Sequence, residues 1–268
     1  MKTLNEFFQR LWVDYAAMND QADAIHKLLE KKGEQIINDH IAFRTVNVPK
    51  LGIDAIAKTF VQLGYEPKGE YKFEEKKLRA KHFEHKDPNQ PKVFISELKL
   101  EECSEYLQKI MKGLVSQVSD KDINREDFVV CGCPWKPISS TDYEKLKAES
   151  EYAAWFAVFG FRVNHFTVFV NALKNFKDLE GLNAFLKRSG FPLNSSGGEI
   201  KGSPQKDFLV QSSTMASRVK VEFSDKKETV PGCYYEFARR FPLPNGKLFQ
   251  GFVVQSADKI FESTDNKS

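Results

Sequence analysis

Apolar and polar residues alternate along the chain with two periodicities, and the first is that of an α-helix. Near the start, apolar side chains three or four residues apart form one stripe at Phe7, Leu11, Trp12 and Tyr15. This spacing predicts an amphipathic helix over residues 3–18. A second helix is predicted from Asp20 to Lys32, because Gly33 follows it as a stop signal.

The second periodicity is the two-residue alternation of β-strands, in runs rich in β-branched and aromatic residues. In the first half these runs predict strands at 41–48, 81–85 and 92–98, with a helix at 51–63. In the second half they predict strands at 161–170, 208–211, 217–223 and 234–239, with a helix at 176–189. The lysine-rich stretch 68–81 is interpreted as a solvated face, and 101–159 as a largely helical connector.

The two halves repeat a plan that begins at a histidine. His40 opens one strand 24 residues before Gly64, and His165 opens another 25 residues before Gly190. Self-similarity of this kind indicates a doubled module. We therefore expect a single domain, 1–268, with modules at about 36–100 and 160–262 and a site between them.

Composition excludes several classes of partner. The chain has 268 residues, 41% of them hydrophobic, which is enough for a substantial core. Its 40 basic and 37 acidic residues leave a net charge of +3, too little to indicate a nucleic acid or membrane surface partner. Neither a signal peptide nor an apolar run of about 18 residues is evident, so a cytoplasmic location is expected.

The strand pattern places chemically active side chains on one face. Because side chains alternate along a strand, His40, Ala42 and Arg44 share a face. Glu236 lies in a run apolar enough to be buried, where a carboxylate needs compensation. One histidine at the start of a strand is usually structural, but two equivalent histidines and a buried glutamate favour a metal site. Two imidazoles and a carboxylate suit Fe(II), and zinc or manganese would also be tolerated.

With these residues identified, the chain resembles the DUF1338 family, the 2-oxoadipate dioxygenase/decarboxylases, which are related in fold to the vicinal-oxygen-chelate (glyoxalase-like) proteins. The resemblance covers nearly the whole chain. Its motifs are Asp39-His40-Ile41-Ala42-Phe43-Arg44-Thr45, Val93 to Leu98, Val163-Asn164-His165-Phe166-Thr167, Pro231 to Arg240, and the stretches Gln250 to Phe252 and Ser256 to Ser263.

The resemblance implies an α+β fold in which two βαβββ modules form a partly closed mixed β-barrel with flanking helices. It further implies that His40, His165 and Glu236 bind Fe(II), that Arg44 anchors the far carboxylate of a 2-oxo diacid, and that Ser256 lies near the substrate. The implied reaction converts 2-oxoadipate and dioxygen to 2-hydroxyglutarate and carbon dioxide, a late step in lysine breakdown. Zinc, nickel or manganese could replace iron in a purified sample.

Two other functions stay open at this point. Glu97 ends a strand of the first module much as Glu236 does in the second. A glyoxalase-type lyase or isomerase would use both carboxylates with the two histidines, bind Ni(II) or Zn(II), and consume no oxygen. Alternatively, a doubled module of this fold could serve as a non-catalytic small-molecule binding protein, because fold alone does not decide function. The sequence gives no oligomeric state.

Overall fold

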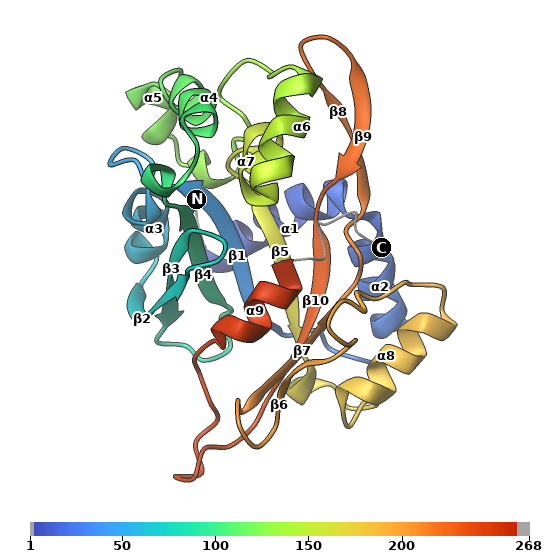
Figure 1. The fold of residues 1–268 in the computed structure, drawn as a ribbon. Helices are drawn as coiled ribbons and strands as arrows, with labels where there is room; N and C mark the ends of the chain where they lie inside the picture. The colour runs from blue at the N-terminus through green and yellow to red at the C-terminus, as the bar shows by residue number, and fades with distance from the viewer. Residues whose placement is uncertain (1–2, 262–268) are drawn as a thin grey trace.

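The computed structural model describes residues 3–261, and its centre is one mixed eight-stranded sheet (Figure 1). The strands of this sheet are β1 (Asn38–Val46), β2 (Tyr65–Phe73), β3 (Leu78–His85), β4 (Lys92–Leu98), β5 (Val163–Phe169), β6 (Lys201–Ser203), β7 (Leu209–Ser213) and β10 (Tyr234–Arg240). A separate hairpin consists of β8 (Arg218–Glu222) and β9 (Lys227–Pro231).

The strand order shows how the two halves of the chain are related. It runs β2-β3-β4-β1-β5-β10-β7-β6. In each half the last strand lies parallel to the first, β4 beside β1 and β10 beside β5. The two remaining strands follow toward the edge of the sheet, β3 and β2 on one side and β7 and β6 on the other. The first strands β1 and β5 meet in the middle of the sheet and run antiparallel. This order supports the predicted doubling, while the module boundaries at 36–100 and 160–262 stay a prediction.

Helices cover the two faces of the sheet unequally. The longer helices are α1 (Leu4–Met18), α2 (Asp20–Lys31), α3 (Ile53–Gln62), α4 (Glu105–Val115), α6 (Ser140–Glu149), α7 (Glu151–Phe159), α8 (Leu179–Arg188) and α9 (Val254–Phe261). Short turns are α5 (Asp120–Ile123) and the 3-10 helices η1 (Leu100–Glu102), η2 (Phe128–Val130) and η3 (Val170–Ala172). Helices α1, α2, α3 and α8 pack against one face. Helix α9 crosses in front of the other (Figure 1).

The covered face carries the apolar half of each strand. Tyr15 of α1 packs on Phe166 of β5 with ring centroids 5.0 Å apart, and Phe60 of α3 packs on Phe43 of β1 at 5.4 Å. These residues are almost fully buried. The alternate residues of the same strands point to the face under α9, which leaves that face to polar side chains. Among residues 3–261, no helix is both long enough and apolar enough to span a bilayer.

Most predicted elements lie where expected, but four elements were missed. Residues 65–73, read in part as a solvated face, form the edge strand β2, whose side chains are mostly exposed because only β3 flanks it. The short strands β6 and β9 and the helix α9 were also missed. The predicted strand at 217–223 is present as β8 but belongs to the hairpin. Strand pairing at an edge leaves little hydrophobic signal, which explains why the three strands were missed.

Candidate metal centre

Three buried side chains converge under α9 from the middle strands of the sheet. The ligand atoms of His40 on β1, His165 on β5 and Glu236 on β10 all lie within 4.8 Å of one another. Nε2 of His40 is 3.6 Å from Oε1 of Glu236, and Nε2 of His165 is 3.4 Å from Oε2. The two imidazole rings meet edge to face, with centroids 5.5 Å apart. Both histidines thus direct the same nitrogen toward one carboxylate.

A β-bulge precedes each histidine and brings a second polar side chain to its ring. The pairing of β1 with β5 skips Asp39 on one strand and Asn164 on the other, and bulges of this kind re-aim side chains. Nδ1 of His40 is 2.8 Å from Oδ1 of Asp39, and Nδ1 of His165 is 3.0 Å from Oδ1 of Asn164. Since a carboxylate only accepts, the His40 proton lies on Nδ1, and Nε2 keeps its lone pair.

Asp39 is itself held by a buried arginine. Arg240 donates from Nε to Oδ2 of Asp39 at 2.6 Å and from Nη2 to Oδ1 at 2.8 Å. Burial alone would raise the pKa of Asp39. The charge of Arg240 and the hydrogen bonds from His40 and Arg240 outweigh burial and bring the pKa far below its usual range. Asp39 is therefore a carboxylate in the folded protein at neutral pH.

The same arginine fixes a segment that covers His40. Nη1 of Arg240 donates to the carbonyl oxygens of Phe249 at 3.0 Å and Gly251 at 2.7 Å. Between them and α9, the ring of Phe252 packs edge to face on His40 at 4.8 Å. The backbone N–H of Phe252 donates to the Tyr71 hydroxyl at 3.2 Å. An aromatic wall thus closes one side of the cluster.

Burial changes the protonation of all three side chains in the same direction, toward neutrality. Burial lowers the pKa of both imidazoles, and the charges of His40 and Arg44 lower that of His165 further. Burial raises the pKa of the Glu236 carboxyl to about 8, although a hydrogen bond from Gln211 opposes the shift. A cation at this point would favour the carboxylate form and suit neutral imidazoles, so the residues present fit a divalent metal ion.

Glu97 does not belong to this cluster, so the alternative in which it acts as a fourth ligand has no support from the geometry. Oε1 of Glu97 accepts from Nε of Arg79, and Oε2 accepts from the backbone N–H of Ile53 at 2.6 Å, at the start of α3. Both partners lie on the opposite face of the sheet. In the strand register Phe94 pairs with Ala42, two residues after His40, as Glu236 pairs with Thr167, two residues after His165. The counterpart of Glu236 is therefore Phe94.

Arg44 lies on the same face as His40, as expected, and is almost completely buried. Its guanidinium carbon is 4.9 Å from the ring centroid of Tyr152 and 5.1 Å from that of Trp155, both on α7. Nη1 donates to Oε1 of Glu151 at 2.8 Å. The partner Glu151 was not foreseen, because it lies 107 residues away in the chain. Strand patterns carry no signal for such a contact.

Ser256, the other expected substrate residue, is buried in α9 beside β6. A Cβ atom added to Gly202 of β6 would lie 3.2 Å from its Oγ atom. Its role near a substrate stays a prediction. The sequence did carry a signal for Asp39 and Asn164, because an acid or amide precedes each repeated histidine. It carried none for Gln211, and Phe252 stood in the motif stretch Gln250 to Phe252 without a role assigned to it.

Comparison with known proteins identifies the family to which the chain is similar. The model of the 2-oxoadipate dioxygenase/decarboxylase family matches residues 12–250. A chloroplast protein of Arabidopsis thaliana with that name is 37% identical over 258 residues, which cover 86% of this chain and 69% of the relative.

Solved structures agree with the fold. A protein of Shewanella frigidimarina described as a candidate hydrolase superposes with a TM-score of 0.91 at 51% identity, over 95% of this chain and 99% of the other. The hydroxyglutarate synthase of Oryza sativa, solved in complex with 2-oxoadipate, superposes with a TM-score of 0.90 at 34% identity. The superposition covers 97% of this chain and 93% of the other.

A more distant structure tests the fold class alone. A glyoxalase-superfamily protein of Ralstonia eutropha gives a TM-score of 0.70 at 21% identity, over 90% of this chain and 83% of the other. The predicted α+β, glyoxalase-like fold is therefore confirmed. With the family model covering most of the chain, the conclusion is that this protein belongs to the 2-oxoadipate dioxygenase/decarboxylase family of enzymes.

Proposed function

We propose that this protein is a non-heme Fe(II) enzyme that converts 2-oxoadipate, or a similar 2-oxo diacid, and dioxygen to 2-hydroxyglutarate and carbon dioxide in lysine catabolism. The observation that carries the proposal is the buried cluster of two imidazoles and one carboxylate, with Phe94 where a fourth ligand would stand. The relatives' names and the 2-oxoadipate complex of the rice protein support it.

The metal ligands in this proposal are His40, His165 and Glu236. Three ligands on one side leave positions open on the other, as in non-heme iron oxygenases. When bound, Fe(II) supplies a redox-active centre at which a 2-oxo acid and dioxygen can meet. Zinc, nickel or manganese could occupy the same ligands in a purified sample.

The protein's own residues prepare this centre. Asp39 and Asn164 accept from Nδ1 of the two histidines, so both rings present a neutral Nε2 in a fixed orientation. Gln211 donates to Glu236 and holds the carboxylate between the rings. Phe252 and Tyr234 pack on the imidazoles at 4.8 and 4.7 Å and exclude water from them.

The substrate end of the site is assigned to Arg44 and Ser256. Arg44 lies four residues beyond His40, about 13 Å along the strand, and its side chain can span much of that gap. Its planar fork suits the far carboxylate of a diacid. The reaction breaks the bond between the substrate's carboxylate and ketone carbons, and both atoms of dioxygen are retained in the two products, so atoms balance.

The alternatives are weaker than this proposal. A four-ligand lyase or isomerase needs a second carboxylate, and Glu97 is engaged by Arg79 and Ile53 on the opposite face. A non-catalytic binding protein need not keep a complete buried ligand set. Cytoplasmic location stays a prediction, and the plant relatives are named as chloroplast proteins.

The test is reconstitution of the metal-free protein, separately with Fe(II), Zn(II), Ni(II) and Mn(II). We expect 2-hydroxyglutarate from 2-oxoadipate with Fe(II) under air and none without oxygen. Product formation with Ni(II) or Zn(II) in the absence of oxygen would contradict the proposal. His165→Ala should bind no stoichiometric iron while keeping its fold by circular dichroism.

A further inference from the structure

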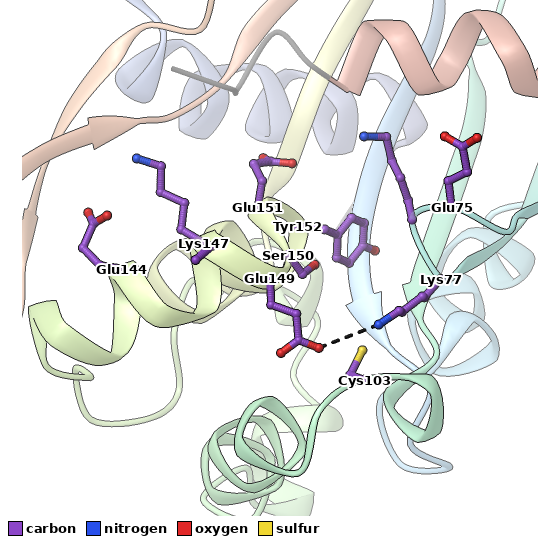
Figure 2. Close-up of a pocket in the computed structure, with 11 residues that line it drawn as sticks. Glu75, Lys77, Cys103, Glu144, Lys147, Glu149, Ser150, Glu151 and Tyr152 are labelled. Atoms are coloured by element: carbon purple, nitrogen blue, oxygen red, sulfur yellow. Dashed lines mark ion pairs between the residues drawn. The ribbon is translucent and has the colours of Figure 1, made fainter. Parts of the chain in front are cut away.

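A cavity of about 450 Å³ opens between α6, the start of α7 and the turn from β2 to β3 (Figure 2). Its lining includes Glu75, Lys77, Cys103, Lys147, Glu151 and Tyr152. Charged side chains from the β2–β3 turn and from the segment 144–151 meet there, and Lys77 lies 3.8 Å from Glu149 at the rim. The cavity is polar, unlike the aromatic wall over His40.

Two residues of this lining also contact Arg44. Glu151 accepts from Nη1 of Arg44, and the ring of Tyr152 lies against its guanidinium. The Arg44 side chain is 1% exposed, whereas that of Glu151 is 18% exposed. The ion pair therefore stands at the boundary between the cavity and the face of the sheet that carries the cluster, with the arginine inside and the glutamate on the cavity side.

This arrangement solves a problem that a buried arginine creates. A guanidinium out of water is costly without a counter-charge. In the substrate-free protein Glu151 provides that charge through one arm of the fork. The far carboxylate of a 2-oxo diacid is the same chemical group, and it would bring a second negative charge to an already neutral pair. The two carboxylates would repel each other across one guanidinium, so the diacid would compete with Glu151, which has a cavity beside it in which to be hydrated.

We propose that the cavity is the entrance for the substrate and that Glu151 is a placeholder on Arg44, displaced by the far carboxylate of the incoming diacid. This inference rests on the proposed function and deepens it. A 2-oxo monoacid has no group to replace Glu151, so the Arg44–Glu151 pair stays intact when it binds. Glu151 thereby influences which 2-oxo acids the protein prefers, without touching the reacting atoms.

The test compares the binding of 2-oxoadipate and 2-oxohexanoate, which have the same chain length, by calorimetry on anaerobic Fe(II)-loaded protein. Glu151→Gln keeps an oxygen that accepts from Arg44 but removes the competing charge. It should bind 2-oxoadipate roughly tenfold more tightly, since a neutral hydrogen bond is easier to displace than a charge-assisted one. Binding of 2-oxohexanoate and iron content should not change.

Two further variants control this result. Glu149→Gln removes a carboxylate from the same rim, one that binds Ser104 and Lys77 instead of Arg44, and should leave both affinities unchanged. Glu151→Asp keeps the charge on a shorter arm and should fall between wild type and Glu151→Gln.

The outcomes separate the two proposals. If wild type turns over 2-oxoadipate but Glu151→Gln binds it no better, or more weakly, then Glu151 orients Arg44 and the placeholder inference is wrong. Equal tightening for the monoacid would also overturn it. If wild type neither binds nor turns over any 2-oxo diacid, the proposed function fails, and this inference fails with it.

Discussion

Phe94 in the first half of the chain stands where Glu236 stands in the second. Each pairs with the residue two positions beyond a cluster histidine, on a parallel strand of the same sheet. Phe94 packs on Phe252 with ring centroids 4.8 Å apart, and Phe252 covers His40. The doubled fold thus offers two carboxylate positions and fills one with an aromatic ring. In the proposed function, that difference leaves a metal position for a substrate that binds through two oxygens.

Introducing a carboxylate at this position should change the chemistry. Phe94→Glu is expected to keep or strengthen metal binding but to abolish oxygen uptake, because a fourth ligand occupies a position that substrate or oxygen needs. Metal analysis and an oxygen electrode check it. Phe94→Leu, which should cost about 1 kcal/mol of stability and retain uptake, is the control. Undiminished uptake by Phe94→Glu would show that position 94 does not reach the metal.

Asn164 and Asp39, which accept hydrogen bonds from the two histidines, should both affect metal affinity, but only Asp39 should strongly affect stability. Asn164→Ala is expected to weaken metal affinity roughly tenfold, because the His165 ring loses its acceptor. Asp39→Asn should do the same and also destabilise the fold by roughly 3 kcal/mol, because it leaves Arg240 buried without its counter-charge. Metal titration and urea unfolding measure the two effects. Equal loss of stability in both variants would contradict this account of Arg240.

Stability of the metal-free protein should fall with rising pH between about 6.5 and 8. The pKa of Glu236 is raised to about 8 in the folded state, so the folded protein holds a proton there that the unfolded chain has released. Folding therefore weakens with pH in this window, by up to about 1.4 kcal/mol per pH unit. Below it, the lowered histidine pKa values act in the opposite direction.

A bound metal should remove this dependence, because it keeps Glu236 ionised in the folded state. Urea unfolding at several pH values, with and without metal, makes the comparison. Glu236→Gln should remove the slope from the metal-free protein. A slope that persists in that variant would have to come from another group.

Arg44→Lys should leave metal binding intact and weaken binding of the diacid. A lysine ammonium retains the charge but not the planar fork that binds a carboxylate in a bidentate manner. Between Tyr152 and Trp155 it also loses stacking area. We expect the KM for the diacid to rise at least tenfold with iron content unchanged. An unchanged KM would exclude Arg44 as the anchor.

The three residues at the centre of the site could be predicted from the sequence better than the residues around them. His40, His165 and Glu236 could be predicted because strand periodicity and the internal repeat fix their faces. Glu97 stayed open as a fourth ligand because its place near a strand end resembles that of Glu236. A shift of three residues along β4, from Phe94 to Glu97, moves a side chain to the opposite face. The Arg44–Glu151 pair depends on how α7 docks on the sheet, and no local pattern encodes that contact.

The most direct test of the central claim is oxygen uptake by anaerobically purified, Fe(II)-reconstituted protein on addition of 2-oxoadipate, with carbon dioxide and 2-hydroxyglutarate measured together. The account predicts that one molecule of each product appears for every dioxygen consumed, and that Glu236→Ala and His165→Ala consume none. No uptake by the fully iron-loaded wild-type protein, or uptake that persists in both variants, would contradict it.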